Sequence, residues 1–199
     1  ILILTGARGS GKTTTARLLT ARDGSPKVHL HADDFWHFIK NGAIPPYLPE
    51  AHAQNAIIME ILAKVADGYA RGGYFVVLDG IVGPWFLIPF RSLTVPVHYI
   101  VLSAPLDAVI ERCRARREEG LADPAAIATL HSQFSSLDRL EQHALATGDE
   151  SPEQLAALRG DRAPRVPVVA LAPRRSGGDE GTRRGGKGDG AKRGAGHVG

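Results

Sequence analysis

Residues 4–16 read LTGARGSGKTTTA, and this stretch decides the fold. Four apolar residues, ILIL, open the chain and are typical of a short buried strand, while TTTARLL after the glycines begins a helical pattern. The spacing G-x-x-x-x-G-K-T from Gly6 to Thr13 is a complete Walker A motif. Strand, glycine loop and helix in this order predict a loop that holds phosphate groups.

The glycines of this loop let backbone N–H groups turn inward, and the helix start adds a partial positive charge. Lys12 is expected to reach the β- and γ-phosphates, and the Thr13 hydroxyl is expected to bind Mg²⁺. A plain glycine-rich turn is the alternative, but it would not require the Lys-Thr pair. The predicted nucleotide-binding residues are Gly6, Ala7, Arg8, Gly9, Ser10, Gly11, Lys12, Thr13 and Thr14.

Composition excludes several classes of protein. The 199 residues suit one α/β domain, and the single cysteine, Cys113, leaves no disulfide framework. No apolar run approaches the ~20 residues of a membrane span. We therefore expect a soluble, cytoplasmic chain without a membrane partner; composition does not predict its oligomeric state.

The positive net charge belongs to the end of the chain. From Arg159 onward there are ten Lys or Arg against four Asp or Glu, whereas residues 1–158 carry 14 against 17. A net charge of −3 on the body argues against a nucleic-acid partner. We expect a folded domain over 1–158 and a disordered Gly/Arg-rich tail over 159–199. A basic binding arm, or an out-of-frame sequence that is not a native C-terminus, are the alternatives for the tail.

The remaining pattern alternates strands and helices. KVHLHADD, YFVVLDG and VPVHYIVLSA read as strands, and HALATG is a weaker candidate for a last one. Helical patterns run from about Glu50 to Arg71, after Pro105 and after Asp123. In the first of these we expect one apolar face, which comprises Ile57, Ile58, Ile61, Leu62, Val65 and Tyr69. The alternation predicts a parallel sheet covered by helices on both faces, a three-layer α/β sandwich with its ligands at the strand ends.

Three acids follow predicted strands. Asp79 ends FVVLD, which matches a Walker B strand, so we expect it to hold Mg²⁺ beside Thr13; a turn before Gly80 is the alternative. Asp33 and Asp34 end the second strand, and in a P-loop phosphotransferase this strand end lies across the phosphate site from the glycine loop. A carboxylate there can accept the proton of an attacking hydroxyl. We predict Asp33 as the base and Asp34 as a helix cap or substrate contact.

The segments GARGSGKT, HADDFW, VVLDG and IERCRAR, in this order, resemble the small P-loop kinases that include chloramphenicol phosphotransferase, gluconate kinase and shikimate kinase. The run KVHLHADDFWHFIKNGAIPPYLPEAHAQN with LADPAAIATLHSQF is most similar to a bacterial branch labelled only as kinase or nucleoside triphosphate hydrolase. The resemblance covers residues 1–158. It implies the P-loop NTPase fold with a five-stranded parallel sheet, ATP with Mg²⁺, and an acid at Asp33 that contacts or deprotonates the acceptor.

The resemblance also implies lid arginines that stabilise the transferred group, which fall on Arg112 and Arg116. Their i, i+4 spacing places both on one helix face, although a solvated basic face is the alternative. For the acceptor, a small organic alcohol, we predict contacts with Trp36, His52, Gln54 and Trp85. The alternative is that most of the aromatic side chains fill the core. We expect no metal cluster at His31 and His37, since zinc ligand spacing is missing.

Three functions remain open from the sequence. The first is an ATP-dependent kinase of a small hydroxyl compound. The second is an NTPase or nucleotide switch with water as acceptor, although the Asn-Lys-x-Asp guanine signature is missing. The third is a kinase of a larger target, such as an activated sugar in the manner of zeta-type toxins, or a polynucleotide end.

Overall fold

The computed structural model describes residues 1–115, 124–135 and 137–147. Five strands form one sheet in the order β2-β3-β1-β4-β5, with every neighbouring pair parallel. The strands are β1 (Leu2–Gly6), β2 (Lys27–His31), β3 (Phe75–Asp79), β4 (His98–Ser103) and β5 (Ala144–Ala146). The predicted five-stranded parallel sheet is confirmed, including the weak last strand.

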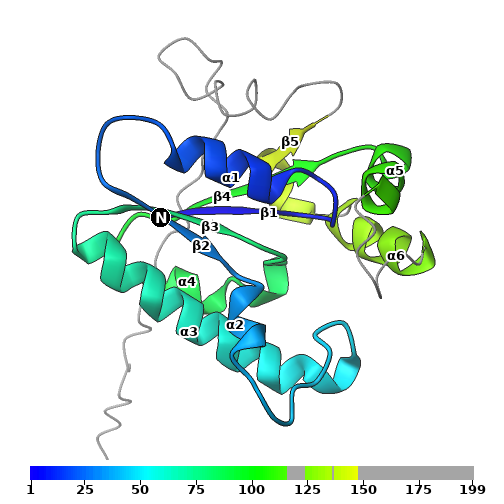
Figure 1. The fold of residues 1–199 in the computed structure, drawn as a ribbon, viewed down its shortest axis with the longest axis horizontal. Coiled ribbons are helices and arrows are strands. Elements are labelled where there is room, and N and C mark those ends of the chain that lie inside the picture. Colours follow the sequence, from blue (N-terminus) through cyan, green and yellow to red (C-terminus); the bar gives the residue numbers. More distant parts are fainter. Residues whose placement is uncertain (116–123, 136, 148–199) are drawn as a thin grey trace, which may run out of the picture.

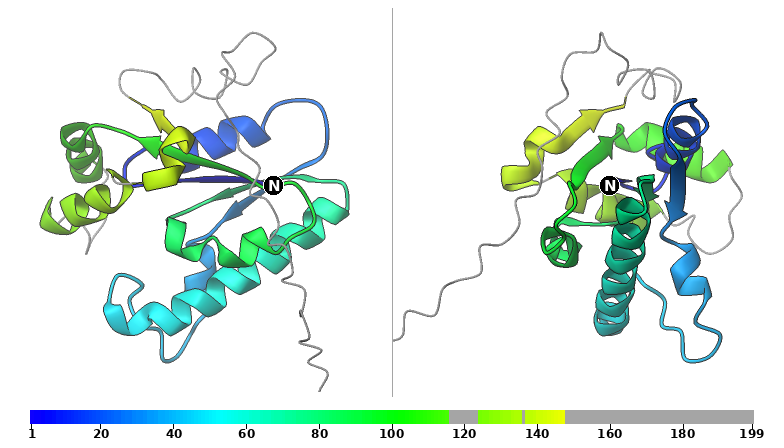
Figure 2. Two further views of the ribbon diagram at one scale, coloured as in Figure 1. Left: turned by 180° about the vertical axis from the view of Figure 1, so that it is seen from behind. Right: turned by 90° about the vertical axis from the view of Figure 1, so that its left-hand side faces the viewer.

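Helices cover both faces of this sheet, as the views in Figures 1 and 2 show. The helix α1 (Lys12–Thr20) lies on one face, and α3 (His52–Arg71) with α4 (Ile88–Arg91) lies on the other. Beyond the end of β1 lie α5 (Leu106–Ala115) and α6 (Pro124–Ser135). Short turns complete the order: α2 (Asp34–His37) and the 3-10 turns Pro49–Ala51, Pro84–Phe86 and Asp138–His143. The predicted tail from Arg159 lies outside the described residues.

Alternation along the central strand divides the core in two. Leu2 and Leu4 of β1 pack toward α1, with Ala16 and Leu19. Ile3 packs on the opposite face with the buried side of α3. A period of two in a strand produces this division, and it is why a strand covered on both faces has a continuous apolar sequence.

The predicted apolar face of α3 is partly wrong. Ile58 and Leu62 are buried as expected, but Ile57 is 60% exposed and Ile61 and Tyr69 are each 43% exposed. The buried side instead includes Asn55, Met59, Ala63 and Ala66. Small alanine side chains let the helix approach the sheet closely on that side, so the larger isoleucines are turned outward. Apolar type alone did not reveal this rotation.

Two neighbouring residues of α3 offer a matched test of this packing. We expect Leu62→Ala to lower the free energy of unfolding by about 2–5 kcal/mol, because a fully buried side chain leaves a cavity. Ile61→Ala, at an exposed position, is expected to change it by about 1 kcal/mol or less. Denaturant titration of both variants measures the difference. Equal losses would contradict the described orientation of the helix.

Register places the ends of three strands at one level. Leu4 of β1 pairs with Asp79 of β3, and Asp79 pairs with His31 of β2. The chain continues two residues beyond these pairs to Gly6 on one side and Asp33 on the other. Parallel pairing therefore brings the glycine loop and the acids after β2 to the same edge of the sheet.

Candidate active site

In the loop between β1 and α1, two of the three glycines with positive φ also lie too close to neighbouring elements to carry a side chain. Gly6 has φ +143°, and a Cβ added there would collide with the carbonyl oxygen of Leu102. Gly9 has φ +79°, and its added Cβ would lie 3.0 Å from the Val109 carbonyl oxygen. Side chains at these positions would push the loop off β4 and α5, so the glycines let the loop pack against its neighbours.

Lys12 and Ser10 are the polar side chains of this loop that best fit a phosphate site. The Lys12 ammonium group donates a hydrogen bond to the Ala7 carbonyl oxygen at 3.0 Å, which folds the side chain back over the loop. Ser10 is 1% exposed, and its hydroxyl finds no hydrogen-bond partner in the described part of the chain. The N-cap of α1 is Gly11, which offers no side chain to the first helical N–H groups. The Ser10 hydroxyl, the charge of Lys12 and the N-terminal end of a helix together fit an anion.

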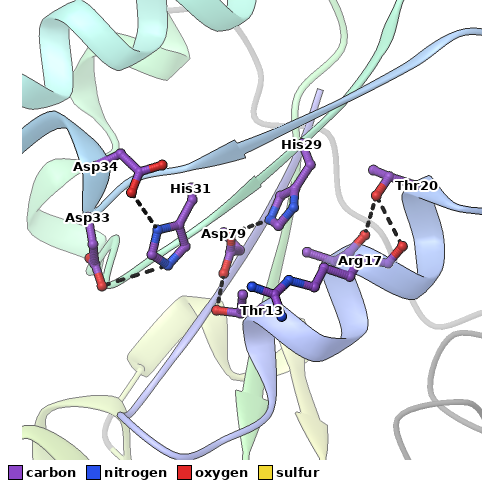
Figure 3. Close-up of polar contacts among 9 residues, drawn as sticks. Thr13, Arg17, Thr20, His29, His31, Asp33, Asp34 and Asp79 are labelled. Carbon is purple, nitrogen blue, oxygen red and sulfur yellow. Dashed lines mark hydrogen bonds and ion pairs between the residues drawn. The ribbon is translucent and has the colours of Figure 1, made fainter. Parts of the chain in front are cut away.

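Asp79 joins β3 to the first turn of α1 and to β2. It is fully buried, accepts a hydrogen bond from the Thr13 hydroxyl at 2.6 Å, and accepts one from His29 Nε2–H at 2.6 Å. Figure 3 shows the carboxylate between these two partners. The pairing with Thr13 fits the predicted Mg²⁺ site, since P-loop sites bind Mg²⁺ through a hydroxyl and an acid with waters and phosphate completing the shell.

Opposing effects set the protonation of Asp79. Burial by itself would raise the pKa of this carboxyl group, but hydrogen bonds from His29 and Thr13 and the nearby charges of His29 and His31 outweigh it. The net result is a pKa below the ordinary value. Asp79 is therefore a carboxylate at neutral pH and supplies the negative charge that a divalent cation requires.

The two acids after β2 are exposed at the same edge of the sheet. The Asp33 and Asp34 side chains are 58% and 61% exposed. His31 lies between them, with Nδ1 3.3 Å from Asp34 Oδ1 and Nε2 3.9 Å from Asp33 Oδ2 (Figure 3). Asp33 occupies the N-cap position of α2 but makes no side-chain cap bond. The cap role predicted for Asp34 is therefore wrong, because Asp34 already belongs to the helix.

Arg112 lies against the phosphate loop. Its Nη1 donates a hydrogen bond to the Gly9 carbonyl oxygen at 3.4 Å, so a guanidinium group carried by α5 contacts the glycine loop. This position is compatible with the predicted stabilisation of transferring charge. Arg116, the other predicted lid arginine, lies outside the described residues.

The side chains predicted to contact the acceptor differ in their exposure and in whether their polar groups already have hydrogen-bond partners. Gln54 uses both ends of its amide on the backbone of Ile44, at 2.7 and 2.9 Å, and so shapes the loop before α3. His52 is exposed and stacks on Phe86, with ring centroids 6.2 Å apart. Trp85 is 46% exposed. The indole of Trp36 is hydrogen-bonded to Asn55 at 2.8 Å.

Sequence reasoning missed three residues of this region. His29 lies in the strand predicted from KVHLHADD, and its bond to Asp79 depends on the register between β2 and β3. Arg17 is an exposed residue one helical turn after Thr13, and the i, i+4 spacing places the two side chains on the same face of α1. Asn55 is a buried amide on α3. The i+4 spacing was a usable signal for Arg17, whereas the contacts of His29 and Asn55 are tertiary.

The described residues contain neither a metal-binding cluster nor a helix suited to a membrane. No group of three or more His, Cys, Asp or Glu in residues 1–115, 124–135 and 137–147 is arranged to hold a metal ion. Among the helices of these segments, none has the length and apolar character needed to cross a membrane.

Comparison with solved structures identifies the fold. The APS kinase CysC from Mycobacterium tuberculosis, in complex with AMPPNP and APS, matches with a TM-score of 0.58 and 21% identity over 78% of this chain and 91% of that chain. Shikimate kinase from Acinetobacter baumannii, in complex with shikimate, matches with a TM-score of 0.55 and 18% identity over 78% and 87%. At such identities the likeness concerns the fold alone.

Other comparisons add the family. A chain of the Pnkp1/Rnl/Hen1 RNA repair complex matches with a TM-score of 0.55 and 20% identity. The match covers 68% of this chain but only 44% of that chain. No curated protein matches the sequence. The sequence matches the family described as AAA domain over residues 1–140. The chain therefore belongs to the AAA domain family and has the P-loop NTPase fold shared by the small P-loop kinases.

Proposed function

We propose that residues 1–158 form an ATP-dependent kinase that transfers the γ-phosphate to a hydroxyl group of a small molecule. One observation carries the proposal: an exposed carboxylate, Asp33, follows β2 at the sheet edge where β1 enters the glycine loop. A nucleotide-binding loop requires no such acid. A phosphotransferase does, because an acceptor hydroxyl must lose its proton as it attacks.

The residues present fit a nucleotide with Mg²⁺. The buried Ser10 hydroxyl has no partner among the described residues, and the N-cap of α1 is Gly11, which has no side chain to occupy the site. Thr13 and Asp79 form an oxygen donor pair of the kind that Mg²⁺ prefers. When bound, Mg²⁺ would neutralise charge on the phosphates. Loop backbone, Lys12 and the open start of α1 would hold the phosphate oxygens.

The transfer itself then needs positioned charges and one base. Asp33 would take the proton of the acceptor hydroxyl. The oxygen of that hydroxyl would bond to the γ-phosphorus while the bond from the phosphorus to the bridging oxygen of ADP breaks. Lys12 and Arg112, with Arg116, would stabilise negative charge on the transferring group. Asp34 is proposed to contact the acceptor. Trp36, His52, Gln54 and Trp85 are proposed to line or shape its pocket, which favours a small organic alcohol.

A transfer assay tests the proposal. Purified protein is incubated with Mg²⁺, ATP labelled in the γ-phosphate, and pools of small hydroxyl compounds, and the labelled products are separated. We expect label in an organic product in at least one pool, at a rate above the release of inorganic phosphate. Release of phosphate to water alone, unchanged by every pool and by Asp33→Asn, would instead favour an NTPase.

A further inference from the structure

The turn that carries Asp33 cannot hold its own orientation. Helix α2 has only four residues, and its N-cap residue Asp33 makes no side-chain cap bond. A single helical turn is unstable in isolation, because nucleation costs more than one or two hydrogen bonds return. Asp33 follows Ala32, whose N–H donates to the Asp79 carbonyl oxygen, so the contacts of α2 with other elements act together with this anchor to place the Asp33 carboxylate.

One such contact is a buried amide on α3. Trp36 of α2 donates its indole Nε1–H to Asn55 Oδ1 at 2.8 Å, and Asn55 Nδ2 donates to the Pro46 carbonyl oxygen at 2.8 Å. Asn55 is only 6% exposed. Both ends of one side chain are thus used, and they join α2 to the loop that precedes α3. Figure 1 shows α2 lying beside the first turns of α3.

The neighbouring amide makes a useful contrast. Gln54 binds Ile44 through both of its amide ends and contacts the loop alone. Asn55 is the member of the pair that also reaches the helix next to Asp33. Loss of Asn55 would leave the half-buried indole N–H of Trp36 and the Pro46 carbonyl oxygen without their partner side chain, which favours a different arrangement of the turn.

We propose that Asn55 is a positioning residue, which through Trp36 holds the α2 turn so that Asp33 faces the phosphate loop. This inference rests on the proposed function. Reactions of bound groups are sensitive to small displacements, and a shift of about 1 Å can cost about 100-fold in rate. Asn55 would thus control the rate of transfer without touching nucleotide or acceptor.

A double-mutant cycle tests this role. Wild type, Asn55→Ala, Asp33→Asn and the double variant are assayed with labelled MgATP and the pool of hydroxyl compounds, and MgATP affinity is measured separately. We expect Asn55→Ala to lower transfer about 10- to 100-fold and to change the Kd for MgATP less than about threefold. Because Asn55 acts through Asp33, Asp33→Asn should cost at least about tenfold less in the Asn55→Ala background than in wild type.

Two further variants separate positioning from folding. Trp36→Phe removes the indole N–H but keeps an aromatic ring, so it should also lower transfer. It replaces Asn55→Ala as the test where that variant does not fold. Arg71→Ala breaks the contacts of Arg71 with Asp67 and Thr94 at the other end of α3 and should leave transfer unchanged.

Three results would overturn the inference: normal transfer by Asn55→Ala, normal transfer by Trp36→Phe, or losses that simply multiply in the double variant. Absence of transfer by the wild-type protein in every pool is a different failure, since it removes the proposed function and the role of Asn55 with it.

Discussion

Lys12→Ala is expected to lower phosphate transfer by about 1,000-fold and to weaken MgATP binding. The Lys12 ammonium group already lies over the loop, held by the Ala7 carbonyl oxygen at 3.0 Å, so its charge is in place before a nucleotide arrives. Fixed charges of this kind stabilise transferring phosphoryl groups because no reorganisation is needed during the reaction. Transfer of labelled phosphate and titration with MgATP measure the two effects.

Lys64→Ala is the matched control for this change. Lys64 is an exposed lysine of α3, so the same loss of charge and side chain there should leave transfer and binding unaltered. Circular dichroism would show whether both variants fold. Transfer by Lys12→Ala within about tenfold of wild type would mean that the loop does not hold the phosphate being transferred.

How much of the fold follows from sequence depends on whether the signal is local. The buried strand before Gly6 and the glycine loop are contiguous, and both were predicted with their bounds nearly correct. Strand order is a different matter. In the sheet, β3 lies between β1 and β2. This order depends on where the connecting helices cross the sheet, and the apolar periodicity of the sequence does not predict it. The rotation of α3 depends likewise on which side chains meet the sheet.

In the site, too, residues within contiguous motifs were predicted, whereas residues that depend on tertiary contacts were not. The loop residues and the Thr13–Asp79 pair come from two motifs, and the structure brings that pair within 2.6 Å. His29 could not be assigned to Asp79, because the two residues meet only through the register of neighbouring strands. Gln54 was predicted to contact the acceptor, yet its amide is used on the loop backbone. Polar type indicates a capacity to bind, whereas folding decides the partner.

Asp33→Asn is expected to abolish most of the transfer, by about 100- to 10,000-fold, while ATP binding stays within about threefold of wild type. The amide is close in size to the carboxylate but cannot accept the hydroxyl proton at neutral pH, so the loss should fall on the chemical step. Stability should change little, since the Asp33 side chain is 58% exposed and caps no helix. The measurement is the labelled-transfer rate at saturating ATP, beside an independent titration with MgATP.

Two other acids, Asp34 and Asp23, serve as controls for this prediction. Asp34→Asn, one residue away and equally exposed, removes the same charge and is expected to reduce transfer by about tenfold or less, mainly at low acceptor concentration. Asp23→Asn, in the exposed loop after α1, should have no effect. If Asp34→Asn caused the large loss and Asp33→Asn the small one, the base would be Asp34. If neither acid mattered while transfer persisted, the proton would have to leave by a route that uses no carboxylate from the end of β2.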